Sequence, residues 1–256
     1  MKTYQSRKKF IATAICIVFV LACVSCNTPS KTVWNIGTKD NATSDLALGP
    51  SDYKRFLEKD FGYEDRYYLI GKSVPERDFP YVIPGPDDTW GGTWSTSGWR
   101  THEINILFGI HQLKDNTQFD FVIDLFDSSP TRSLLKVIIN DLQSEKIELK
   151  GQDKESLTGE AGEQAGQTIT IPIHNHVLRK GGNKITLTVL EGGWVLFDAV
   201  RLEASKSVAL EKPDKVFIRD IQPANYELSI DGNHFQPLLV DVEHLEGQDR
   251  YSPLSF

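Results

Sequence analysis

The sequence predicts an all-β protein, built as an antiparallel β-sandwich. Apolar and polar residues alternate along many short segments, glycine-rich turn signals separate these segments, and no amphipathic helix of roughly 10–15 residues lies between them. The 256 residues include 19 glycines and 12 prolines but one methionine. This balance favours many turns over long helices. The length suits one large β-domain, or a domain of roughly 150–180 residues with a small second one.

The alternation of apolar and polar residues places the strands. Turn signals such as Gly181-Gly182-Asn183 and Glu191-Gly192-Gly193 separate them. The one helix expected is short, over residues 53–59, with Ser51 as its cap. Residues 151–166 are acidic and glycine-rich and predict an exposed loop. Strands are expected over residues 33–37, 103–110, 119–125, 135–139, 147–149, 169–173, 185–189 and 194–202.

The first 26 residues predict an export signal. Residues 1–9 hold four basic side chains and no acidic one, and residues 10–23 form a nearly unbroken apolar run. A run of about 14 residues suits a signal peptide but is too short to span a bilayer as a helix. A short polar linker, residues 27–32, separates this leader from the folded body.

Residues 20–23, Val-Leu-Ala-Cys, resemble a bacterial lipobox. The resemblance implies that Cys23 carries a lipid. Cys26, which follows Ser25, is the alternative, and a plain secretory signal with incidental cysteines is the other interpretation. A lipid at one end of a polar body predicts an exported lipoprotein that is anchored to a membrane and does not span it. The expected location is the outer membrane, on its periplasmic or its surface face.

Charge and cysteine usage exclude several kinds of function. The net charge is −7 although the leader is basic, so the body is acidic and nucleic acid is disfavoured as a partner. All three cysteines lie in the leader, which leaves the body without a disulfide, a zinc thiolate site or a cysteine nucleophile. No serine-nucleophile elbow, phosphate loop or dinucleotide motif occurs. No cofactor is expected, and a structural calcium ion is possible without support from the sequence.

The composition changes after residue 203. Residues 204–214 form a polar linker, and new strands are expected from Lys215, over 226–230 and over 238–242. Without disulfides, this segment of 204–256 is too short for an independent β-domain. It is expected either to complete the edge of the sandwich or to open a further domain.

Two groups of motifs resemble a known family. Residues 34–37, Trp-Asn-Ile-Gly, followed by Asp40, are similar to the opening of the third, carbohydrate-binding-module-like domain of the rhamnogalacturonan lyases, polysaccharide lyase family 4. Residues 182–189 and 195–202 resemble the closing pair of strands of that domain. The resemblance implies a jelly-roll, galactose-binding-like sandwich over residues 33–203.

This resemblance implies a module that binds carbohydrate, associated with pectin and rhamnogalacturonan. The family's catalytic lyase domain has no room before Val33, so catalysis is not expected of this chain alone. One alternative is the N-terminal part, or a relative, of a multidomain rhamnogalacturonan lyase or glycoside hydrolase. A second alternative is a structural module that binds no sugar.

The best candidate for a ligand site is the loop of residues 87–102. Aromatic faces stack on sugar rings, while acidic and basic side chains bind the hydroxyl groups, so the expected ligand is a plant-type polysaccharide or oligosaccharide. The competing interpretation is that the tryptophans plug the end of the sandwich. No catalytic residue and no metal ligand are assigned. The candidate residues are Trp90, Trp94, Trp99, Arg100, His102, Asp87 and Asp88.

Three weaker signals in the sequence each have a competing structural explanation. Asp87 and Asp88 are adjacent, so on a strand they point in opposite directions and are favoured as turn residues over a catalytic pair. His174 and His176 have a spacing that could hold a metal, but with no third ligand nearby they are favoured as strand-end residues. Asp198 is expected to be buried with backbone amides, Arg100 or a cation as its partner.

Overall fold

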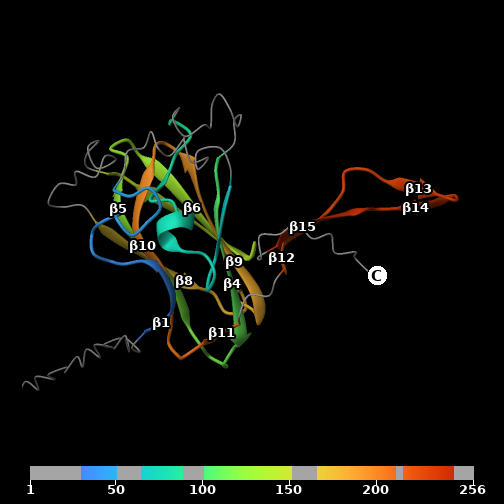
Figure 1. Ribbon diagram of the computed structural model, residues 1–256, viewed down its shortest axis with the longest axis horizontal. Helices are drawn as coiled ribbons and strands as arrows, with labels where there is room; N and C mark the ends of the chain where they lie inside the picture. The colour runs from blue at the N-terminus through green and yellow to red at the C-terminus, as the bar shows by residue number, and fades with distance from the viewer. Residues whose placement is uncertain (1–29, 51–64, 89–100, 152–165, 212–215, 245–256) are drawn as a thin grey trace, which may run out of the picture.

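The computed structural model describes residues 30–50, 65–88, 101–151, 166–211 and 216–244. Over residues 31–211 these form two packed β-sheets, and a separate β-segment follows (Figure 1). The predicted all-β sandwich is therefore confirmed. The described residues contain one helix, the single turn α2 (Pro75–Asp78). That helix is too short to cross a bilayer.

Nearly all strand pairs are antiparallel. The first sheet has the order β1 (Lys31–Gly37), β10 (Val195–Ala204), β5 (Phe119–Ser128) and β8 (Gln167–Ile173), with β3 (Val82–Ile83) added to β10. The second has the order β11 (Ala209–Glu211), β4 (Ile104–Gln112), β9 (Gly181–Glu191), β6 (Ser133–Ile139) and β7 (Gln143–Leu149). The exception is β2 (Arg66–Leu69), which runs parallel to β4. Sequence neighbours often lie in different sheets, as in a jelly roll.

The alternation of apolar residues explains the core. Inward side chains of β5, such as Phe121 and Ile123, are fully buried in one cluster with Ile106 and Phe108 of the opposite sheet. Trp34 joins the two layers, with its ring centroid 5.3 Å from that of Phe108. A β-strand buries alternate residues on one face, so the predicted strands supply the core without disulfides.

The opening and closing motifs of the family resemblance meet in the structure. In the pairing of β1 with β10, Ile36 lies opposite Val200 and Gly37 opposite Ala199. Gly37 has a φ of 75°, and an added Cβ would lie 2.6 Å from the carbonyl oxygen of Asp198. Only glycine fits this approach. The two ends of the sandwich sequence are thus held side by side.

The partners expected for Asp198 are found among backbone amides. Its carboxylate accepts hydrogen bonds from the amide of Asp40 at 3.3 Å and from that of Asn41 at 3.1 Å. Burial raises the pKa of Asp198, although these amide bonds act in the opposite direction. Arg201, as expected, does not pair with it and instead contacts Asp124 and Glu203.

A second buried carboxylate, Asp124, lies on β5 and is 2% exposed. It accepts a hydrogen bond from Thr168 at 2.6 Å and pairs with Lys39 at 3.0 Å and with Arg201. Burial acts to raise the pKa of Asp124, but the bonds from Thr168, Lys39 and Arg201 outweigh it, and the pKa lies below its ordinary value. The ionised carboxylate therefore stabilises the first sheet.

This arrangement predicts how stability depends on pH. Because the pKa of Asp124 is lower in the folded protein, its contribution is complete above the unfolded-state pKa and is lost as the pH falls through the folded-state pKa. Asp124→Asn is expected to lower the free energy of unfolding by about 2 kcal/mol above about pH 5, and by less below about pH 4. Urea unfolding at several pH values measures both curves. Asp231→Asn, at an exposed turn, serves as control; a pH-independent loss for Asp124→Asn would contradict the prediction.

The C-terminal strands do not complete the sandwich. β12 (Val216–Pro223) pairs with β15 (Leu238–His244), and β13 (Leu228–Ile230) pairs with β14 (Asn233–Phe235). Figure 1 shows this segment projecting to one side. Within residues 204–256, β11 therefore forms the sandwich edge beside β4, whereas the strands from Val216 onward pair only with one another in the described residues.

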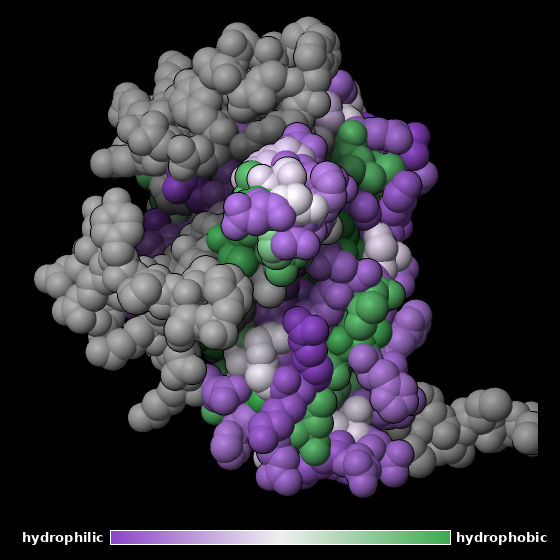
Figure 2. Space-filling model, turned by 90° about the vertical axis from the view of Figure 1, so that its right-hand side faces the viewer, coloured by the Kyte–Doolittle hydropathy of each residue, from purple (hydrophilic) through white to green (hydrophobic). Residues whose placement is uncertain are grey.

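The projecting segment exposes apolar side chains. Figure 2, viewed from the side to which it projects, shows a largely polar surface with smaller apolar areas. Among residues 224–240, whose exposure the structure describes, the exposed large apolar residues are Tyr226, Leu228, Ile230, Phe235, Leu238 and Leu239. The short helix expected over 53–59 and residues 152–165 of the expected loop lie outside the described residues.

The strand registers define two ends of the sandwich. The upper end in Figure 1 carries the described loop residues 84–88, 129–132 and 192–194. The lower end carries residues 113–118, 140–142, 174–180 and 205–208, because Phe119 lies opposite Ile173 and Ala204 at that end. β1 also begins at the lower end, with Lys31 opposite Ala204.

Candidate functional site

The structure describes the two borders of the ligand loop predicted from the sequence, residues 87–88 and 101–102, and both lie at the upper end. Asp87 is exposed, whereas Asp88 is half-buried. The Asp88 Oδ2 accepts a hydrogen bond from the amide of Gly85 at 2.8 Å, so this carboxylate stabilises the turn that begins the loop. The predicted residues that lie outside the described part of the chain are Trp90, Trp94, Trp99 and Arg100.

His102, at the other border of the loop, belongs to the interior. The residue is 3% exposed, and its carbonyl oxygen accepts a hydrogen bond from Thr188 Oγ1 at 2.8 Å. The structure therefore places His102, for which the sequence predicts a sugar contact, among buried residues. His102 lies two residues before the buried strand β4, where every residue from Ile104 to Phe108 is buried.

The β9–β10 turn supports the loop from below. Gly192 has a φ of 82°, and an added Cβ would lie 1.8 Å from the carbonyl oxygen of Arg132. Its own carbonyl accepts a hydrogen bond from the amide of Asp87 at 3.1 Å. A Cβ on Gly85 would lie 2.2 Å from the same carbonyl. The loop therefore starts from backbone packed on backbone, which is a rigid base for a binding loop.

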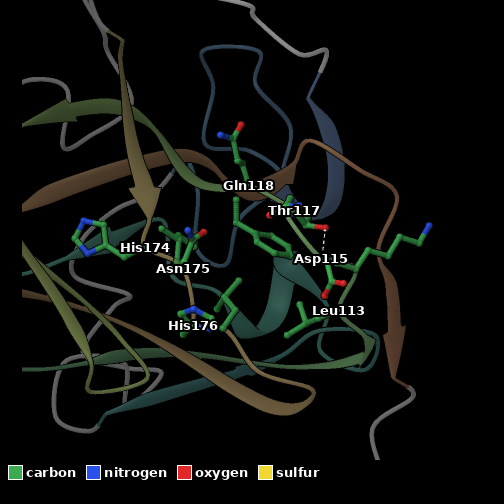
Figure 3. A pocket seen from close by; sticks show the side chains of 12 residues that line it. Leu113, Asp115, Thr117, Gln118, His174, Asn175 and His176 are labelled. Atoms are coloured by element: carbon green, nitrogen blue, oxygen red, sulfur yellow. Dashed lines mark hydrogen bonds between the residues drawn. The ribbon is translucent and has the colours of Figure 1, made fainter.

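A pocket of about 600 Å³ lies at the lower end of the sandwich, far from the predicted loop. It is formed by the β4–β5 and β8–β9 connections. Figure 3 shows His174, Asn175 and His176 along one side, with Leu113 and Asp115 along the other. Its lining residues are Leu113 to Phe119 together with Ile173, His174, Asn175, His176 and Leu178.

The pocket has an apolar floor and a polar rim. Phe119, Ile173 and Leu178 are 7%, 8% and 6% exposed and belong to the core. The side chains above them are exposed: they are amides, imidazoles, one basic side chain and one acidic side chain. These rim residues are Lys114, Asp115, Asn116, Gln118, His174, Asn175 and His176.

Two amide side chains, the buried Gln143 and the half-buried Asn140, hold the β8–β9 connection in place. Gln143 accepts a hydrogen bond from the amide of His174 at 2.9 Å and donates one to the carbonyl of Pro172 at 2.9 Å. Asn140 donates to the carbonyl of Val177 at 2.7 Å. The pocket wall is thus fixed from beneath by side chains that do not themselves line it.

Asn183 closes the same connection at its other end. This side chain is 1% exposed. Its Oδ1 accepts hydrogen bonds from the amide of Arg179 at 2.9 Å and from Asn140 at 2.8 Å, and its Nδ2 donates to the carbonyls of Arg179 and Gly181. Asn183, which lies in the motif of residues 182–189, therefore holds the end of the β8–β9 connection in position.

Neither end provides a metal site in the described residues. No three His, Cys, Asp or Glu side chains of that part of the chain are grouped as a metal centre requires. His174 and His176 share the pocket rim, which agrees with their interpretation as surface residues after a strand. Of the residues that line the pocket, these two histidines are the ones that the sequence analysis considered, as a possible metal pair.

Comparison with known families identifies the family whose model matches the sandwich. The model of the family described as CBM-like, polysaccharide lyase family 4, domain III, matches residues 32–202. This match confirms the resemblance noted from the sequence motifs. Comparison with curated proteins gives no match.

Several solved structures are similar to this chain at low identity. A family 35 carbohydrate-binding module from Cellvibrio japonicus is 14% identical, with 44% of this chain and 70% of that chain covered and a TM-score of 0.31. A family 35 module from an environmental isolate is 14% identical, with 66% and 91% covered and a TM-score of 0.33. A family GH115 4-O-methyl-α-glucuronidase with specificity for decorated arabinogalactans is 14% identical, with 67% and 17% covered and a TM-score of 0.33.

Proposed function

The chain belongs to the CBM-like domain III family of polysaccharide lyase family 4, and from this premise we propose that it is an exported module that binds pectic polysaccharide. The observation that carries the proposal is the family match, which spans nearly the whole sandwich from residue 32 to residue 202. The described residues add a rigid scaffold with loops at both ends. Binding, not catalysis, is the proposed activity.

The loop of residues 87–102 is the proposed ligand site. Its three tryptophans are spaced by glycines and hydroxyl side chains, a composition that suits stacking on sugar rings. The two tryptophans of the described residues, Trp34 and Trp194, are 4% and 6% exposed and belong to the core. Stacking on sugar is therefore assigned to the tryptophans of this loop, and hydrogen bonding to the sugar hydroxyl groups is assigned to Arg100 and the exposed Asp87.

Substitution of the loop tryptophans tests this site. Trp94→Ala is expected to weaken binding of pectic oligosaccharide by about 1–3 kcal/mol, the scale of an aromatic hot spot, and to leave the thermal midpoint of unfolding nearly unchanged. Trp99→Ala is expected to act mainly on stability, because Trp99 leads into β4. Titration calorimetry and thermal unfolding of Trp90→Ala, Trp94→Ala and Trp99→Ala measure the two effects separately.

A matched control uses an exposed aromatic elsewhere. Tyr226 is 51% exposed on the projecting segment, so Tyr226→Ala is expected to change neither binding nor unfolding. If all three tryptophan variants lose about 3–5 kcal/mol of stability, the tryptophans are buried plugs. In that case, or if all three bind as the wild type does, the loop is not the ligand site.

Export and membrane anchoring form the second part of the proposal. The basic and apolar leader with its lipobox-like residues supports lipidation at Cys23. Cys23→Ala is expected to abolish acyl-chain labelling and to release the protein from the membrane fraction. Retained labelling in Cys23→Ala, together with its loss in Cys26→Ala, would move the lipid to Cys26.

A further inference from the structure

We propose that the pocket at the lower end is a second carbohydrate site, which takes an acidic sugar unit of the polysaccharide. This inference rests on the proposed function for the class of its ligand. It concerns a different surface, since the pocket is built from the β4–β5 and β8–β9 connections and shares no residue with the loop of residues 87–102. The evidence is the shape, the charge and the rigidity of the pocket.

The shape and lining of the pocket suit a sugar ring. A volume of about 600 Å³ lies within the range of small-ligand sites. The apolar floor around Phe119 and Leu178 can cover the C–H face of a sugar, while the amides of Asn116, Gln118 and Asn175 can bind hydroxyl groups as donors and acceptors. Such a mixed lining is poorly suited to a purely apolar ligand.

The charges around the pocket favour an acidic ligand. The lower-end loops carry four cations, against the two acids Asp115 and Asp141, in a protein whose net charge is −7. Asp141 is already paired with Lys184 at 3.6 Å. Within the described residues, Lys114 forms no ion pair, which leaves its ammonium group available to a carboxylate. The four cations are Lys114, Arg179, Lys180 and Lys206.

The backbone of the pocket is held in an uncommon conformation. His176 has a φ of 72°, in the left-handed region that a residue with a Cβ adopts at a cost. The turn is closed by the bond from the amide of Val177 to the carbonyl of His174 at 3.2 Å and is held by Gln143 and Asn140. A fixed wall reduces the ordering cost of binding, and a strained residue in such a wall is consistent with a binding role.

Two sites at opposite ends would let one module contact a polysaccharide twice. Strands of 7 to 11 residues separate the ends, which corresponds to roughly 25–35 Å. Two weak contacts on one chain reinforce each other through effective concentration. An acidic polysaccharide would therefore bind more tightly than its short fragments.

An anionic membrane surface is the competing source of negative charge, because β1 begins at the same end. A flat membrane would contact the exposed lysines without filling a pocket. The apolar floor and the amides of the rim are explained by a sugar and not by lipid headgroups, so the observations favour the sugar.

Hydrogen–deuterium exchange of the full chain in nonionic detergent tests the inference. Oligogalacturonide is the acidic probe, and a neutral galacto-oligosaccharide is the control ligand. We expect oligogalacturonide to protect residues 113–118 and 174–178 and the neutral ligand to protect them much less. Lys114→Ala and Asn175→Ala are each expected to weaken this binding, Lys114→Ala by about tenfold. Both residues are exposed, so folding should persist.

Lys146→Ala provides the matched control, because Lys146 is exposed on β7 and does not line the pocket. It is expected to bind as the wild type does. Protection confined to the borders of the upper loop, residues 84–88 and 101–103, would overturn the second site and leave the proposed function intact. Absence of protection by any pectic ligand at either end would overturn both. Protection of the pocket by anionic vesicles and not by oligogalacturonide would assign the lower end to the membrane.

Discussion

Gly192→Ala is expected to lower the free energy of unfolding by about 3–5 kcal/mol and to abolish binding at the upper loop. The new Cβ would lie 1.8 Å from the carbonyl oxygen of Arg132, and the φ of 82° is itself unfavourable for alanine. The atoms nearest to this Cβ belong to the backbone of Arg132 and Ser133 and not to a flexible side chain, so the turn must move. Because its carbonyl accepts the amide of Asp87, a displaced turn also displaces the start of the ligand loop. Urea unfolding and calorimetry measure the two losses.

Gly181→Ala separates the steric clash from the cost of the backbone angle. Gly181 has a φ of 84°, nearly the same as that of Gly192, but an added Cβ would meet no atom within 4 Å. Its substitution is therefore expected to cost about 1–2 kcal/mol, the penalty of the left-handed conformation alone. Equal losses in the two variants would show that contact with Arg132 does not determine the role of Gly192.

The predictable part of this protein is the part that depends on local alternation. Each of the eight strands expected over residues 33–202 forms, since a strand with one buried face shows its period in the sequence. Burial of Asp198 with backbone amides was also predictable, because a mid-strand carboxylate between apolar residues must find donors. The resemblance of the motifs to a known family then predicted that these strands form one sandwich.

The missed elements depend on tertiary contacts. β2 is four residues long and pairs in parallel with β4, and its surroundings rather than its composition make it a strand. β11 has three residues and exists because the edge of β4 is unpaired there. The C-terminal strands were expected from their composition, but their pairing with each other was not, since alternation does not specify a partner.

The pocket was missed for a related reason. Its two walls, residues 113–119 and 173–178, are far apart in sequence, and neither contains a pattern that indicates a site by itself. The spacing of His174 and His176 could hold a metal, but a metal site requires a third residue, so the sequence favours them as strand-end residues. In the structure they instead line a pocket whose floor is apolar and whose opposite loop supplies amides and Lys114.

Asn183→Ala is expected to lower the free energy of unfolding by about 3 kcal/mol. The side chain is 1% exposed and serves two donors and two acceptors, including both polar backbone groups of Arg179. An alanine leaves these groups without their partner, and each buried polar group left so costs about 1–3 kcal/mol, less where water can enter. The measured quantity is the urea midpoint of the full chain in nonionic detergent.

The same substitution tests whether rigidity of the β8–β9 connection matters for the second site. Asn183 does not line the pocket, yet Asn183→Ala is expected to speed hydrogen exchange over residues 174–180 and to weaken oligogalacturonide binding there. Asn35→Ala is the matched control, because Asn35 is exposed and donates one hydrogen bond, to the carbonyl of Gly37, so its loss should cost less than about 1 kcal/mol. Exchange over 174–180 that stays at the wild-type rate in Asn183→Ala would show that Gln143 and Asn140 suffice to hold the wall. Weakened binding without faster exchange would instead mean that the variant alters the pocket by some route other than loosening its backbone.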